Sequence, residues 1–89
     1  MSRYQVVVRV WPREGVADPQ GATIERSLGA LGFRTIFQMR TGKCFSFVVE
    51  ADDEAGAESQ AADLCDRFLT NPVIEQYDLA LSATVAPVP

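Results

Sequence analysis

The stretch YQVVVRVW, residues 4–11, decides the fold because its side chains alternate between two faces with the period of a β-strand. One face is expected to point toward the core and carries Tyr4, Val6, Val8 and Val10. The other face is mixed and carries Gln5, Val7, Arg9 and Trp11. The remaining elements are placed outward from this strand.

A helix is predicted to follow, from Pro19 to about Leu31. Asp18 can cap its first turn, and proline is favourable at the first helical position because its missing N–H costs nothing there. Gly32 can supply the left-handed residue that ends the helix. One apolar stripe runs along it and consists of Ile24, Leu28 and Leu31.

Two β-rich runs, residues 33–40 and 44–51, are separated by Thr41-Gly42-Lys43 and predict an antiparallel hairpin. A second helix is predicted after Asp52 or Asp53, and Asn71-Pro72 ends it because the residue before proline disfavours helical torsions. A short last strand follows over residues 77–81. The apolar stripe of the second helix is Ala57, Ala61, Leu64, Cys65 and Phe68.

The predicted order is βαββαβ, a ferredoxin-like α+β fold with a four-stranded antiparallel sheet and both helices on one face. One domain is expected over residues 1–82, with a short C-terminal tail over 83–89. The open face of the sheet should carry Val7, Trp11, Cys44 and Val48, which is too apolar a set to stay fully exposed. We therefore expect a partner subunit to cover it.

Charge argues against a nucleic-acid partner. The chain of 89 residues has a net charge of −4 and a pI near 4.6. Residues 1–43 carry seven basic and three acidic residues (+4), and residues 44–89 carry one basic and nine acidic (−8). Phosphate binding needs clustered Lys and Arg, and the run Lys43–Val48 matches an RNA-recognition pattern only in part. No apolar run is long enough to span a membrane, so a cytoplasmic protein is expected.

Catalytic chemistry of its own is not expected of this chain. Histidine is absent, which removes the commonest general base, and the two cysteines lack the spacing of a zinc or redox motif. The acidic run 52–54 fits the start of a helix better than a cation site. The loop 15–21 has two glycines but lacks the ending of a phosphate-binding loop. We predict no catalytic, cofactor or metal site.

Four segments together resemble the PurS family, the small subunits of phosphoribosylformylglycinamidine synthase. The resemblance extends from the first strand to about Leu81. The last of the four segments is the most specific, because its rigid exit from the second helix is hard to explain by fold alone. The segments are GVADPQG (15–21), LGF (31–33), RTGK (40–43) and NPVIEQY (71–77).

The resemblance implies a non-catalytic subunit of an enzyme of de novo purine biosynthesis. Its partners would be a glutaminase, which releases ammonia, and a large synthetase, which uses ATP and Mg²⁺. The small subunit would join the two and support ammonia transfer, and it would form a homodimer, with a tetramer as a further option. The residues expected to meet partners are Trp11, Arg40, Lys43, Asn71, Glu75 and Tyr77.

An alternative of a different class stays open at this point. The same βαββαβ order resembles ACT domains, which are regulatory modules that bind small ligands. An amino acid would then bind near the loop between the first strand and the first helix.

Overall fold

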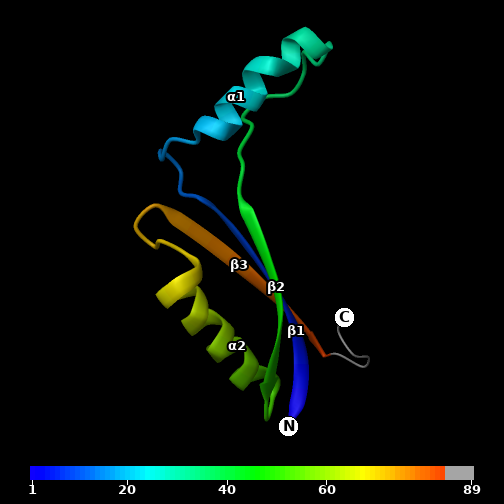
Figure 1. Ribbon diagram of the computed structural model, residues 1–89, viewed down its shortest axis with the longest axis vertical. Coiled ribbons are helices and arrows are strands. Elements are labelled where there is room, and N and C mark those ends of the chain that lie inside the picture. Colours follow the sequence, from blue (N-terminus) through cyan, green and yellow to red (C-terminus); the bar gives the residue numbers. More distant parts are fainter. Residues whose placement is uncertain (84–89) are drawn as a thin grey trace.

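A three-stranded antiparallel sheet organises the protein in this computed structural model, which describes residues 1–83. The first strand is central, and the strand order is β2-β1-β3. One helix packs on the sheet, and the other stands at the far end of the molecule (Figure 1). The elements are β1 Ser2–Pro12, α1 Pro19–Leu28, the 3₁₀ turn η1 Gly29–Leu31, β2 Lys43–Ala51, α2 Glu54–Leu64, the π-helical turn η2 Cys65–Leu69 and β3 Glu75–Ala83.

The core lies between this sheet and α2. Val8 of β1 pairs with Phe45 of β2 on one side and with Leu79 of β3 on the other, so apolar side chains from all three strands share one face. From α2 and the start of η2, small side chains meet this face and are fully buried. The predicted inward face of β1 is confirmed. The buried core cluster is Val6, Val8, Val10, Ala61 and Cys65.

The predicted four-stranded sheet is wrong, because residues 33–40 pair with no strand. Two of their backbone amides donate to α1 instead. The amide of Phe33 donates to the Leu28 carbonyl at 2.9 Å, and that of Met39 donates to the Glu25 carboxylate at 2.7 Å. Gln38 has a left-handed φ of 60°, which a regular strand does not contain. The β-rich sequence is thus held beside α1 and away from the sheet.

The expectation that both helices cover one face is also wrong. α2 covers the sheet, whereas α1 and the returning chain form an arm, residues 19–42, that extends beyond the end of the sheet (Figure 1). The radius of gyration is 16.9 Å, against about 12 Å for a compact domain of this length. The molecule measures 52 × 30 × 18 Å. The predicted stripe of α1 therefore finds no sheet, and Leu31 is 70% exposed.

The predicted helix caps are confirmed, whereas α2 ends at Leu64 and continues only as the π-helical turn to Leu69, before the predicted end at Asn71-Pro72. Asp18 accepts a hydrogen bond from the Gly21 amide at 3.1 Å, Asp53 accepts one from the Gly56 amide at 2.7 Å, and Gly32 caps η1 with a φ of 91°. Within the described part of the chain, no helix is both long and apolar enough to cross a membrane. Most of the predicted tail, residues 84–89, lies outside the described residues, so the domain boundary stays a prediction.

Candidate partner-binding surface

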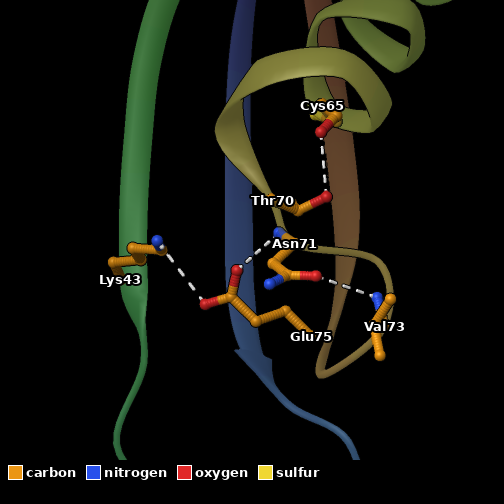
Figure 2. Close-up of polar contacts among 6 residues, drawn as sticks. All are labelled: Lys43, Cys65, Thr70, Asn71, Val73 and Glu75. Carbon is orange, nitrogen blue, oxygen red and sulfur yellow. Dashed lines mark hydrogen bonds and ion pairs between the residues drawn. The ribbon is translucent and has the colours of Figure 1, made fainter.

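Three of the six expected partner residues meet where β2 and β3 begin (Figure 2). The Glu75 carboxylate lies between them: one oxygen accepts a hydrogen bond from the Asn71 amide at 2.8 Å, and the other is 3.5 Å from the Lys43 ammonium. The Glu75 side chain is only 19% exposed, against 51% for that of Lys43. These residues therefore fasten the loop after η2 to the start of β2, before any partner is considered.

The loop itself, residues 70–75, is closed by its own polar groups. The Asn71 side-chain oxygen accepts from the Val73 amide at 3.2 Å, and the Asn71 carbonyl accepts from the Glu75 amide at 2.8 Å (Figure 2 shows the first of these). This internal bonding leaves apolar side chains to face outward. Val73 is 80% exposed and Ile74 is 43% exposed. The loop thus presents apolar surface on a rigid frame.

Arg40 belongs to the arm, and Trp11 lies near the end of β1 that leads to it. The Arg40 guanidinium donates to the carbonyls of Arg13 and Val16 at 3.3 and 3.2 Å, so it braces the loop after β1. A shallow hollow of about 420 Å³ near Gly42 is lined by Trp11, Arg40 and Lys43. Lys43 therefore connects the two groups of expected partner residues.

Tyr77 belongs to the inner face of β3 and not to the loop surface. Its hydroxyl donates to the Asp66 carboxylate at 3.1 Å, which ties β3 to η2. The pKa of Tyr77 is raised, first by burial and then by this hydrogen bond to Asp66. Tyr77 therefore positions η2 relative to the sheet.

Asp18 is a polar centre that the sequence did not single out beyond its role as a cap. Its carboxylate accepts from the Thr41 amide at 2.6 Å and from the Thr41 hydroxyl at 2.7 Å, in addition to the Gly21 amide. The Thr41 hydroxyl, then the Thr41 amide, lowers the pKa of Asp18. These contacts join the segment that leads into the arm, at Asp18, to the segment that leads out of it, at Thr41.

The open face of the sheet is crossed by polar pairs. The Arg9 guanidinium makes a two-pronged contact with the Asp78 carboxylate, at 2.9 and 2.6 Å. Gln5 donates to the Ser46 hydroxyl at 2.6 Å. Val7 and Val48 lie half-buried among these pairs. That a partner subunit covers this face stays a prediction.

Exposed apolar side chains gather in two places, and most of them were predicted to lie in the core or in a strand. One is the arm, and the other is the outer side of α2 and the turns that follow it. Phe68 and Leu69 both follow Cys65 at spacings that an α-helix would bury, so the sequence carried no local signal that Phe68 would be exposed. The exposed set is Ile24, Leu31, Phe33, Ile36 and Phe37 on the arm, and Leu64, Phe68, Val73 and Ile74 at the other place.

The sequence that forms this fold matches a known protein family. A family model for PurS, phosphoribosylformylglycinamidine (FGAM) synthase, matches residues 5–83, which include all of β2, α2 and β3. The chain belongs to the PurS family. The resemblance seen in the four sequence segments is thereby confirmed.

Individual PurS proteins resemble this chain in sequence and in structure. The PurS subunit of phosphoribosylformylglycinamidine synthase from Archaeoglobus fulgidus is 39% identical over 67 residues, which is 75% of this chain and 84% of the relative. A chain in the structure of PurLQS from Thermotoga maritima superposes with a TM-score of 0.85 at 32% identity, over 92% of this chain and 100% of that one. PurS from Methanocaldococcus jannaschii, described as one of the subunits of formylglycinamide ribonucleotide amidotransferase in the purine biosynthetic pathway, gives 0.78 at 29% identity over 89% and 95%.

In this PurS chain, replacing Glu75 with glutamine should lower the free energy of unfolding by about 0.5–1 kcal/mol, the usual range for a partly exposed ion pair. The amide oxygen of glutamine can still accept from Asn71, so the loss isolates the contact with Lys43. Urea unfolding of E75Q, of Lys43→Gln and of the double variant measures it. Losses that simply add in the double variant would show that the two side chains do not interact.

Proposed function

We propose that this PurS chain is a non-catalytic small subunit of phosphoribosylformylglycinamidine synthase in de novo purine biosynthesis, assembled with a glutaminase and a large synthetase in the cytoplasm. The observation that supports this most directly is the superposition on a whole chain of the PurLQS structure. Family membership over residues 5–83 supports the same activity for the complex.

The proposed role is to hold the two other subunits together. Glutamine hydrolysis and ATP- and Mg²⁺-dependent amidation would take place on the partners, and this chain would keep their sites close so that ammonia passes between them without escaping to water. An elongated molecule of 52 Å with exposed apolar surface at two separate places suits such a bridging role. Interfaces need anchors of this kind, since a few buried aromatic or aliphatic residues provide most of the binding free energy.

Self-association is proposed to use the arm. Phe37 is 73% exposed and Phe33 is 52% exposed, and neither is covered within the chain. A short domain gains stability by burying such surface against a second copy, and a closed twofold contact is the commonest solution. We therefore place a homodimer at the arm, with a tetramer as a further level of assembly.

Reconstitution tests the function. Synthetase and glutaminase purified from the same organism should show glutamine-dependent synthesis of phosphoribosylformylglycinamidine only when this chain is added. The synthetase alone should still accept free ammonia, because its chemistry does not need this chain. Full glutamine-dependent activity of the two partners without the chain would contradict the proposal.

A cleft of about 830 Å³ beside the β1–α1 loop is the observation that favours the ACT-like alternative. Its charged residues are largely engaged within the chain: Asp18 with Thr41, Glu25 with the Met39 amide, and Arg40 with backbone carbonyls. Few charged groups are left to bind the ammonium and carboxylate of an amino acid. Calorimetry with the isolated chain separates the two functions, since saturable amino-acid binding without assembly would favour the alternative.

A further inference from the structure

The open edge of the sheet at β2 continues directly into the arm. β2 pairs with β1 on one side, and among residues 1–83 no strand pairs with its other side. Figure 1 shows the returning chain of the arm running beside α1 and into β2. Residues 36–42 of this chain contain no helical turn and no bend. We call residues 36–51, which join this stretch to β2, the long edge.

Contacts at the base of the arm use one side of the stretch and leave the other side free. The amide of Met39 donates to the Glu25 carboxylate at 2.7 Å, and that of Thr41 donates to the Asp18 carboxylate at 2.6 Å. No other amide of this stretch donates to an acceptor within the described part of the chain. The buried Gly21 makes room for the approach, because a Cβ there would lie 2.7 Å from the Met39 carbonyl oxygen.

These contacts prevent the stretch from covering β2 of its own chain. A hairpin turn that brought it back onto β2 would break the bonds from Met39 and Thr41. With those bonds intact, the stretch can reach a β2 edge only in another copy. An unpaired edge of this kind is a template for such pairing. The left-handed Gln38 is compatible with it as the first residue of a bulge, which strands at sheet edges tolerate.

The long edge is complementary to itself. A twofold axis close to Lys43 and Cys44 would set two long edges antiparallel, so that residues 36–42 of each copy lie beside β2 of the other. The exposed ring of Phe37 would then meet the inner side of β2, where Phe47 is only partly buried. Both copies use the same surface, as a closed twofold contact requires.

Charge favours this arrangement over contact between two arms. The arm, residues 19–42, has three basic residues and one acidic residue, a net charge of +2. The rest of the chain has five basic and eleven acidic residues, a net charge of −6. Two arms would therefore repel each other, whereas an arm is attracted to the body of a second copy. The antiparallel arrangement also carries Arg34 toward the acidic run 52–54 that follows β2.

We infer that two copies of this chain associate through their long edges, so that the arm of each copy binds along β2 of the other. The sheet within each chain keeps its three strands, and the added strand comes from the second copy. The inference rests on the proposed self-association and adds where each arm binds. It also assigns β2 as the receiving edge.

The two cysteines test the position of the axis. Cys44 is exposed and would lie next to the axis, whereas Cys65 is buried. Residues that face each other directly or diagonally across two antiparallel strands have Cβ atoms within about 8 Å. A short bis-maleimide should therefore join two wild-type chains through Cys44, and Cys44→Ser should abolish the product. A wild-type dimer that does not cross-link would overturn the inference.

Phe37→Ser tests the arm, with Phe68→Ser as the matched control because the two side chains are exposed to a similar extent, 73% and 80%. Sedimentation should show dimerisation of F37S weakened at least about tenfold, as expected for an aromatic anchor, and that of F68S unchanged. Circular dichroism checks that both variants are folded. Equal dimerisation of F37S and the wild type would contradict the inference.

Hydrogen exchange separates the receiving edge from other contacts. As the dimer forms, amides in residues 36–40 and in β2 should become protected together. Protection of residues 36–40 without β2 would mean that two arms meet each other, and would overturn the inference.

Salt tests the charge complementarity. Dimerisation should weaken as salt rises, and Arg34→Gln should reduce that dependence. Arg67→Gln is the matched control, since Arg67 pairs with Asp63 of its own chain at 2.9 Å. Equal effects of R34Q and R67Q would contradict the proposed place of the arm's tip.

Failure of this inference and failure of the proposed function are distinguishable. A wild-type chain that stays monomeric would overturn the inference and the proposed homodimer. Glutamine-dependent synthesis in the reconstituted complex tests the joining of synthetase and glutaminase separately, because one copy could still contact both.

Discussion

Gly42→Ala should destabilise the protein by about 1–3 kcal/mol or more, the cost of forcing an extra carbon into a packed site. A Cβ built on Gly42 would overlap the Val10 carbonyl oxygen and lie 3.3 Å from the Trp11 Cβ. The oxygen belongs to the backbone of the central strand, so it cannot move aside as a flexible side chain would. Urea unfolding followed by the fluorescence of Trp11, the single tryptophan, measures the loss.

Gly29→Ala is the matched control for this substitution. Gly29 has a helical φ of −59°, and a Cβ there would meet no atom within 4 Å. Alanine at such a site restricts the unfolded chain and should raise the free energy of unfolding by about 0.4–1 kcal/mol. Equal effects of the two substitutions would contradict the close approach at Gly42.

Ala61→Leu should cost about 1–3 kcal/mol, because Ala61 is fully buried where α2 rests on the sheet. The small side chains of Ala57 and Ala61 let the helix lie close to the β1 valines, and a leucine must push it outward. The shift should also move the turn that follows α2, so the free energy of unfolding and the exposure of Leu64 and Phe68 should change together. Chemical denaturation gives the first, and the fluorescence of a dye that binds exposed apolar surface gives the second.

Ala55→Leu makes the same chemical change on the exposed side of this helix. It should alter the free energy of unfolding by no more than about 0.5 kcal/mol, since surface substitutions away from special features are usually that small. A large loss in A55L, or none in A61L, would mean that helix propensity and not packing governs the effect.

The sequence predicted the elements whose signals are local. The alternation of Val6, Val8 and Val10 marked the central strand, and Asp18, Gly32 and Asp53 marked helix ends through their own side chains or backbone torsions. Each of these signals is complete within a few residues.

What failed depended on contacts distant in the sequence. Residues 33–40 have the composition of a strand, but Met39 donates its amide to the Glu25 carboxylate of α1, a choice that no local pattern reveals. The apolar stripe of α1 failed for the same reason. Its helical spacing predicts a buried face but does not tell whether a sheet or another subunit covers that face. Lys43, Asn71 and Glu75 were predicted as a partner surface, and the structure joins them to one another. Whether they also meet a partner stays a prediction.

The pairing of β1 with both neighbours has a consequence for how the protein is made. β2 follows β1 within the first 51 residues, but β3, which closes the other side of β1 from Tyr4 to Pro12, spans residues 75–83. A nascent chain that has emerged only as far as α2 therefore carries its central strand with one edge unpaired, a state prone to wrong pairing. Translation pauses or premature release before residue 75 should yield fragments that aggregate, and chaperone binding during synthesis should be strongest in that interval.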